Sequence, residues 1–138
     1  SFPTRRSSDL KNIHAHYLLP VPLSTQKLSA RGFNQSWEIA RRIDCKFTAQ
    51  KLPYALKREH REHQQVGGGL SIRQLAIQGV FYIEAGFAEI LRGQRVIVFD
   101  DVMTSGATLN EIARVLKDNG VLHVINWVAL RTAKVPHV

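Results

Sequence analysis

Cysteine is almost absent from this sequence of 138 residues, since Cys45 is the only one. An internal disulfide needs two cysteines and is therefore excluded, as is a zinc site built from several thiolates. This cysteine usage is typical of reducing compartments, and we predict a cytoplasmic location. Long apolar runs are also missing. None approaches the roughly 20 residues that a membrane-spanning helix requires, so we predict no membrane insertion.

The commoner nucleotide-binding motifs are missing as well. A Walker loop requires a Gly-Lys pair, and no glycine in the chain precedes a lysine. A dinucleotide fingerprint requires GxGxxG after a strand, whereas Gly67-Gly68-Gly69 follows a charged loop. A response-regulator domain needs a phosphoacceptor aspartate on a strand after its acidic pair. Only Asp118 follows Asp100-Asp101, inside a predicted helix.

Acidic residues are few, because 11 Asp and Glu stand against 19 Lys and Arg, which gives a net charge of +8. A polyanionic partner would suit this balance, either a nucleic acid or a highly phosphorylated small molecule. A basic but otherwise inert surface fits the charge equally well. Charge alone leaves these readings open.

Residues 1–10 differ in character from the rest, because they are polar and without periodicity. The string resembles the translation of a common short-read sequencing adapter, so we interpret 1–10 as a non-native segment and leave it out of the fold prediction. Residues 11–138 are then expected to form one domain that lacks its native N-terminal part.

One stretch organises the remaining chain. The apolar run Val96–Phe99 predicts a strand buried on both faces, followed by Asp100-Asp101 and by the small-residue turn 104–106. Apolar residues then recur at helical spacing. A helix N-terminus suits a phosphate, and paired acids suit sugar hydroxyls or a metal beside the phosphate. We therefore predict a sugar-phosphate site. The helical positions are Leu109, Ile112, Val115 and Leu116.

The other segments predict an α/β fold with a largely parallel sheet. Asn34 is expected to cap a helix, and Gly120 is expected to follow the end of the last helix. Segment 57–70 is charged and then glycine-rich, which favours a mobile lid. The other predicted elements are strand 11–19, loop 23–31, connector 45–56 with a short strand near 54–56, helix 71–77, strand 79–83, connection 84–93 and strand 121–130.

Three further spots have two interpretations each. The pair His14 and His16 could bind a metal, as could His60 and His63, but surface histidines are favoured because no further ligand is specified. Arg31-Gly32 could form a second anion site before the helix at Asn34, or only a turn with a solvated arginine.

The stretch 96–108 resembles the phosphoribosyl-pyrophosphate loop of type I phosphoribosyltransferases. Two other stretches, Pro20–Leu23 and Arg31–Gln35, are similar to the ComF/GntX family of competence-associated phosphoribosyltransferase-like proteins. Similarity also covers Gln64 or Gln65, Leu70-Ser71, Arg73 and Gly79–Phe81. The sequence departs from that family at Ala76, where asparagine is usual, and it lacks the usual N-terminal cysteine-rich zinc module.

The resemblance implies binding of phosphoribosyl pyrophosphate with Mg²⁺, and transfer of its phosphoribosyl group to an unidentified acceptor with release of pyrophosphate. The alternative is a non-catalytic sugar-phosphate-binding module, or an accessory to DNA uptake. Asp100 and Asp101 are implied to meet the ribose hydroxyls, directly or through the metal. The implied 5′-phosphate loop is Thr104, Ser105, Gly106, Ala107 and Thr108; the implied pyrophosphate side and lid are Val21, Pro22, Leu23, Arg31 and Arg58.

Overall fold

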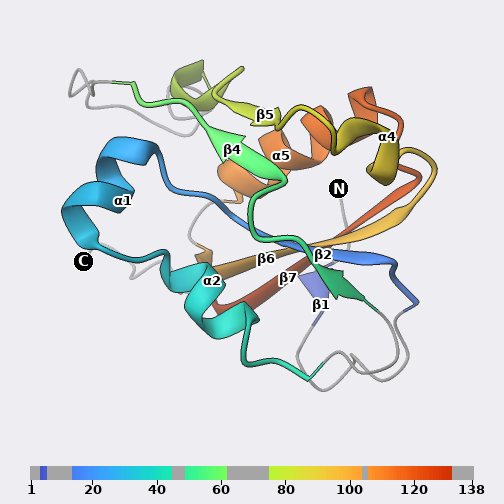
Figure 1. Ribbon diagram of the computed structural model, residues 1–138, viewed down its shortest axis with the longest axis horizontal. Coiled ribbons are helices and arrows are strands. Elements are labelled where there is room, and N and C mark those ends of the chain that lie inside the picture. Colours follow the sequence, from blue (N-terminus) through green and yellow to red (C-terminus); the bar gives the residue numbers. More distant parts are fainter. Residues whose placement is uncertain (1–3, 6–13, 45–48, 62–74, 104–105, 132–138) are drawn as a thin grey trace, which may run out of the picture.

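The computed structural model describes residues 4–5, 14–44, 49–61, 75–103 and 106–131. It is an α/β fold, as the sequence predicts. A five-stranded sheet, in the order β1-β7-β6-β2-β3, is parallel throughout, and β4 pairs with β5 in a separate antiparallel sheet (Figure 1). The strands are β1 (Thr4–Arg5), β2 (Tyr17–Pro20), β3 (Gln50–Lys51), β4 (Leu56–Arg58), β5 (Phe81–Ile83), β6 (Arg95–Met103) and β7 (His123–Arg131); the helices are α1 (Thr25–Arg31), α2 (Gln35–Ala40), α4 (Ala88–Leu91) and α5 (Ala107–Asp118).

The order of the strands fixes where a ligand can enter. The chain runs from β2 outward to β3 on one side, then continues on the other side of β2 with β6 and β7. The direction of winding therefore reverses between β2 and β6. In open parallel sheets, such a reversal leaves a crevice outside the carboxyl ends of the two strands. The residues that follow Pro20 and Phe99 stand at that crevice, because these two residues are partners in the β2–β6 ladder.

The sheet has apolar residues on both faces, because successive side chains of a strand point to opposite sides. In β6, Val96 and Val98 pack toward α5, while Ile97 and Phe99 pack toward α2. All four are at most 1% exposed. The predicted doubly buried strand is therefore confirmed. Figure 1 shows α5 with the β4–β5 pair on one side of the sheet and α2 on the other.

Helix α5 forms as predicted. Its apolar positions Leu109, Ile112, Val115 and Leu116 are all buried, because they recur on the face that packs on the sheet. Gly120 follows the C-cap residue Asn119 with a φ of +89°, the left-handed conformation that favours glycine.

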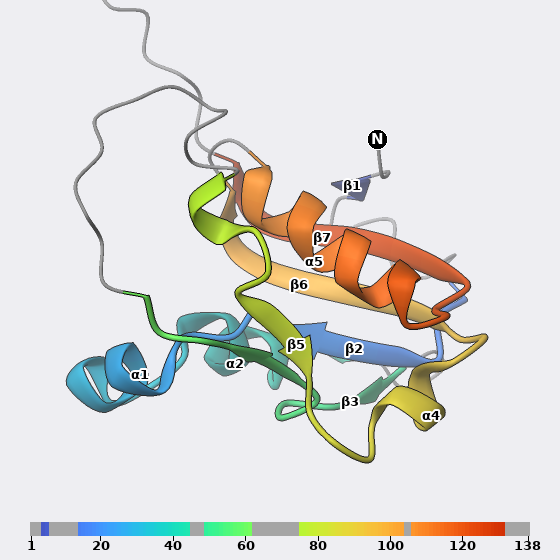
Figure 2. The same cartoon turned by 90° about the horizontal axis from the view of Figure 1, so that it is seen from above.

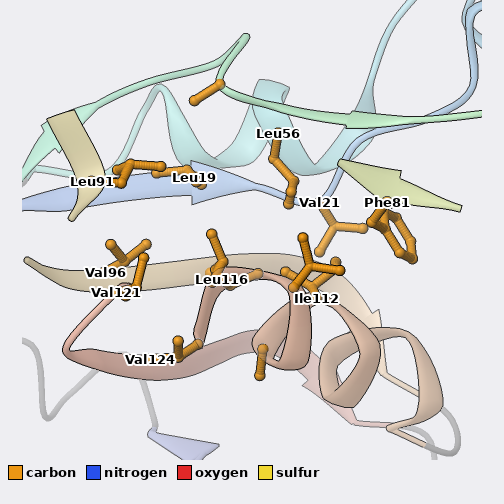
Figure 3. Packing of buried hydrophobic residues seen from close by; sticks show 14 of the residues in the cluster. Leu19, Val21, Leu56, Phe81, Leu91, Val96, Ile112, Leu116, Val121 and Val124 are labelled. Atoms are coloured by element: carbon orange, nitrogen blue, oxygen red, sulfur yellow. The ribbon is translucent and has the colours of Figure 1, made fainter. Parts of the chain in front are cut away.

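The β4–β5 pair closes the same side of the core. Leu56 and Phe81 are buried there with Val21 at the end of β2 (Figure 3). Figure 2 shows β5 leading into α4. Arg58, the last residue of β4, pairs with Phe81 and forms a backbone bridge with Ser24, four residues after the end of β2.

Several expectations about local structure are wrong. Segment 23–31 is expected to be a loop, but it forms α1, because Ser24 accepts a hydrogen bond from Lys27 N and Gly32, at φ +87°, ends the helix. Connection 84–93 contains α4. The strand expected near 54–56 is β4, which begins at Leu56 and extends into the expected lid, and β3 was not predicted. The predicted strands 79–83 and 121–130 correspond to β5 and β7.

Two further differences concern residues 1–10 and the acidic pair. We left 1–10 out of the fold prediction, yet Thr4 and Arg5 form β1 and pair with Asn126 and Trp127 at the open edge of β7. Their non-native origin stays a prediction. The acids Asp100-Asp101 were expected after the strand, but β6 runs on through both to Met103, because β7 continues to pair with it.

Candidate functional site

A pocket of about 180 Å³ lies at the crevice between the ends of β2 and β6. It collects residues that are far apart in the sequence, from the turn after β2, α1, the start of α2, β4, β6 and α5. Most of the predicted site residues of the described chain meet here. The lining residues are Val21, Pro22, Leu23, Arg31, Asn34, Gln35, Ser36, Arg58, Asp100, Asp101 and Thr108.

The two acids form one wall of the pocket, which we call the acid wall (Asp100 and Asp101). Buried Ser36 of α2 reaches both of them, because its Oγ lies 3.1 Å from Asp101 Oδ1 and 3.4 Å from Asp100 Oδ1. The same oxygen accepts the backbone N–H of Asp101 at 3.2 Å. Burial, with the adjacent carboxyl of Asp101 as the second cause, raises the pKa of Asp100 to about 7. The strand therefore holds two carboxyls closer together than two full charges favour.

The turn after β2 is tied to the start of α2. Val21 N donates to Phe99 O at 2.8 Å, which is the last rung between β2 and β6. Asn34 Nδ2 donates to Val21 O at 3.0 Å. Asn34 Oδ1 also accepts from Trp37 N at 3.2 Å, so the predicted N-cap is confirmed. The Val21–Leu23 turn thus lies against the helix that reaches the acids.

Two arginines also line the pocket, and we call them the basic wall (Arg31 and Arg58). Arg58 is half-buried on β4, with its guanidinium carbon 5.3 Å from the centre of the Phe81 ring. Burial lowers its pKa. Within the described ranges, no carboxylate pairs with Arg58. Arg31 is the exposed last residue of α1, and Gly32 makes the turn that follows it. Arg31 also lines the pocket, so its role as a second anion site stays a prediction.

The predicted 5′-phosphate loop is only partly visible, because Thr104 and Ser105 lie outside the described residues. Gly106 precedes α5 with φ +79°, a backbone conformation that glycine adopts without strain. Thr108, in the first turn of α5, lines the pocket. Ala107 lies instead on a separate hollow of about 520 Å³ along α5, which Glu111 and Arg114 also line. The structure therefore brings one of these three residues to the acids.

The acid wall suits Mg²⁺ in its donor chemistry. Two neighbouring carboxyls offer hard oxygen ligands, and a divalent cation would favour the charged form of Asp100, whose pKa is raised by burial and by the adjacent Asp101 carboxyl. Magnesium keeps several waters and shares its remaining positions with phosphate oxygens, so two carboxyls suffice. Elsewhere in the described parts of the chain, no group of three or more His, Cys, Asp or Glu could hold a metal. His16 Nδ1 instead accepts from Arg95 N at 3.0 Å. His63 lies outside those parts.

Sequence reasoning missed three residues of the pocket in this role. Ser36 was not singled out, Gln35 was noted only within the stretch Arg31–Gln35 that resembles the family, and Asn34 was given a role only as a helix cap. The position of Asn34 could have indicated them. Asn34 begins a helix directly after the predicted anion site at Arg31-Gly32, so the first residues of that helix lie near the same site. The partner of Ser36 is 65 residues away along the chain, so no local pattern indicates it.

A profile of the family "Phosphoribosyl transferase domain" matches residues 29–134. This match covers most of the chain, including the start of α2, the acid wall and α5. The chain belongs to the phosphoribosyl transferase domain family.

Two curated competence proteins and a curated DNA utilization protein are similar to this chain. It is 29% identical to Competence protein F of Haemophilus influenzae over 89% of the chain and 52% of that protein. It is 25% identical to Competence protein ComFC of Streptococcus pneumoniae, over 94% of the chain and 54% of that protein. It is 29% identical to DNA utilization protein YhgH of Escherichia coli, over 83% of the chain and 49% of that protein. The chain spans about half the length of these relatives.

Among solved structures, the chain superposes on the allosteric regulatory enzyme of purine biosynthesis with a TM-score of 0.49 and 15% identity. The superposition covers 86% of this chain and 22% of that one.

Among the helices that the structure describes, none is long and apolar enough to span a membrane.

Proposed function

We propose that this phosphoribosyl transferase domain binds phosphoribosyl pyrophosphate together with Mg²⁺ and transfers the phosphoribosyl group to an acceptor. One observation carries the proposal: a single pocket at the winding reversal is lined by a carboxyl pair and by two arginines. A molecule with a hydroxyl-bearing sugar between two phosphate groups matches this distribution of charge. The first turn of α5 supplies N–H groups for the 5′-phosphate.

In this proposal, each wall has a separate task. Asp100 and Asp101 accept hydrogen bonds from the ribose 2′- and 3′-hydroxyls and orient the ring, while Ser36 keeps their oxygens in place. Arg58 and Arg31 face the pyrophosphate and offset its charge. When bound, Mg²⁺ would be held by Asp100 and Asp101 and would neutralise charge on the departing pyrophosphate.

The reaction needs no protein nucleophile. The bond between ribose C1 and the pyrophosphate oxygen breaks, and its electron pair leaves with pyrophosphate. A nitrogen of the acceptor forms the new bond to C1 and gives up its proton to solvent. Positive charge develops on the ribose ring as the bond breaks, so carboxylates beside the ring stabilise the transition state. Placement and charge, rather than acid–base chemistry by a side chain, are what this chain contributes.

The names of the relatives suggest the biological setting. Two are competence proteins and one is a DNA utilization protein, so we infer that the phosphoribosyl chemistry of this chain serves the use of incoming DNA. The net charge of +8 suits phosphoribosyl pyrophosphate and DNA alike. Binding without transfer is the second candidate, since the pocket supports binding whether or not an acceptor follows.

Calorimetry tests the binding step. Phosphoribosyl pyrophosphate is titrated into the chain with Mg²⁺, and the double variant Asp100→Asn with Asp101→Asn serves as the comparison. We expect binding to the wild type and a loss of at least about 100-fold in the variant, because both hydroxyl acceptors and both metal ligands lose their charge. No heat from the wild type, or equal affinity of the variant, contradicts the proposal. Release of pyrophosphate with candidate bases then separates transfer from binding alone.

A further inference from the structure

Asn34 makes two hydrogen bonds that serve different parts of the structure. Its Oδ1 accepts from Trp37 N at 3.2 Å and caps α2. Its Nδ2 donates in the opposite direction, to Val21 O at 3.0 Å, across 13 residues of sequence. The first bond is what any good N-cap residue supplies. The second bond is not part of the helix cap, because its acceptor belongs to the segment after β2.

The acceptor of the second bond, the Val21 carbonyl, has no hydrogen-bond partner within the described strands of the sheet. Val21 N still bonds to Phe99 O, but the Val21 carbonyl lies beyond the last rung between β2 and β6. Val21 is only 9% exposed. A buried carbonyl without a partner costs roughly 1–3 kcal/mol. Pro22 follows and has no N–H to donate, so the turn has few bonds of its own. Asn34 therefore replaces the missing ladder partner.

The same turn of α2 also contacts the other side of the pocket. Ser36, two residues after Asn34, bonds to both acids of β6. The start of α2 thus connects the turn after β2 with the acid wall after β6, at the point where the two strands diverge. This connection acts beside two others, the bond from Val21 N to Phe99 O and the backbone bridge between Ser24 and Arg58. Among the described residues, Asn34 is the one group that donates a hydrogen bond to the Val21 carbonyl.

We propose that Asn34 is a positioning residue, which holds the Val21-Pro22-Leu23 turn at the distance from Asp100 and Asp101 that the ligand requires. The inference rests on the proposed function, because it assigns the turn to the pyrophosphate half of phosphoribosyl pyrophosphate. Asn34 acts through the turn and not by contact with the reacting atoms. Its removal should weaken binding of the pyrophosphate half and leave the ribose 5-phosphate half unchanged.

The substitution Asn34→Ser separates the two bonds. Serine caps helices about as well as asparagine, but its shorter side chain carries no amide to reach Val21 O. In calorimetry with Mg²⁺, we expect the variant to bind phosphoribosyl pyrophosphate roughly tenfold more weakly, as suits a displaced turn. Ribose 5-phosphate should bind within twofold of the wild type. Hydrogen exchange, followed by mass spectrometry on the whole chain without ligand, should be faster in peptides that contain residues 21–24.

Asn119→Ala is the matched control. Asn119 Nδ2 donates to Val115 O at 2.8 Å, a bond of the same kind at the far end of α5. This variant should bind both probes as the wild type does, with unchanged exchange in 21–24.

Two results overturn the inference. One is an Asn34→Ser variant with wild-type exchange in residues 21–24. The other is an equal loss of affinity for both probes, because a general loosening would produce that. If the wild type binds no phosphoribosyl pyrophosphate, the proposed function fails on its own, and the exchange experiment still decides whether Asn34 holds the turn.

Discussion

The acid wall and the basic wall of the pocket have different structural support. Asp100 and Asp101 continue a strand that has neighbours on both sides, and the four residues before them are at most 1% exposed. Arg58 lies on a three-residue strand of the small second sheet. Arg31 ends α1, a helix that buries none of its residues. Support decreases from the acids to Arg58 and from Arg58 to Arg31.

This difference indicates how the site is prepared for its ligand. The acids are held by the strand and by Ser36, but burial and the adjacent Asp101 carboxyl raise the pKa of Asp100, which reduces stability above about pH 4. The arginines have no such constraint. If the proposed function is correct, their long side chains take up their final geometry together with the ligand, and binding then has to offset the lost rotamer freedom. The following three predictions test this gradation.

The largest effect is expected for Arg58→Ala. A half-buried guanidinium that meets a phosphate contributes about 1.5–3 kcal/mol, so affinity for phosphoribosyl pyrophosphate should fall about 10- to 100-fold in calorimetry. Arg58→Lys should recover part of the loss, because charge returns without the planar fork. Lys57→Ala, the neighbour on β4 outside the pocket lining, removes the same charge and should change affinity less than threefold. A loss under threefold for Arg58→Ala would show that the basic wall does not contact the ligand.

An intermediate effect is expected for Asp100→Asn, measured as the free energy of unfolding without ligand or Mg²⁺. The folded pKa of about 7 exceeds the ordinary unfolded value near 4, so the folded state keeps a proton that the unfolded state has released. Wild-type stability therefore falls as pH rises from about 4 to 7 and is constant above. The free energy of unfolding of the variant should not decrease in this pH range, because the asparagine side chain cannot ionise. The variant should therefore be more stable than the wild type at pH 8, by roughly 1–3 kcal/mol, and about as stable as the wild type at pH 4.

Urea unfolding at pH 4, 6 and 8 checks this prediction, with Asp118→Asn as the matched control. Asp118 pairs with Arg114 on the exposed side of α5, and such a pair contributes little. An Asp100→Asn variant with the same pH slope as the wild type would mean that the acid wall carries no electrostatic strain.

The smallest effect is expected for Arg31→Ala, because an exposed cation at the end of a helix is well solvated. Affinity for phosphoribosyl pyrophosphate should fall about two- to fivefold, and the difference from the wild type should decrease in high salt. Lys27→Ala, one turn earlier on α1 and outside the pocket lining, is the matched control. If Arg31→Ala weakens binding as much as Arg58→Ala, the contribution of each arginine to affinity does not depend on its burial, and the predicted order is wrong.

Local patterns predicted the elements that carry their own signals. Four consecutive apolar residues specify a doubly buried strand, the spacing of Leu109, Ile112, Val115 and Leu116 specifies α5, and Asn34 and Gly120 mark helix ends. Elements with weak patterns were missed. Helix α1 has no buried residue and hence no apolar stripe, and α4 and β3 are each four residues or fewer. Helix α1 forms between two local caps, Ser24 and Gly32, whereas β3 forms by pairing with the distant β2.

The sequence by itself determined the parallel α/β class, the acidic pair, and the residue types of a sugar-phosphate site, since these follow from spacing and composition. Only the tertiary structure decided that Asp100 and Asp101 lie within the strand, that Ser36 holds them, and that Arg58 of the second sheet lines the same pocket. The physical reason is separation along the chain. Contacts between β2, α2, β4 and β6 depend on strand order and packing, which no local pattern encodes.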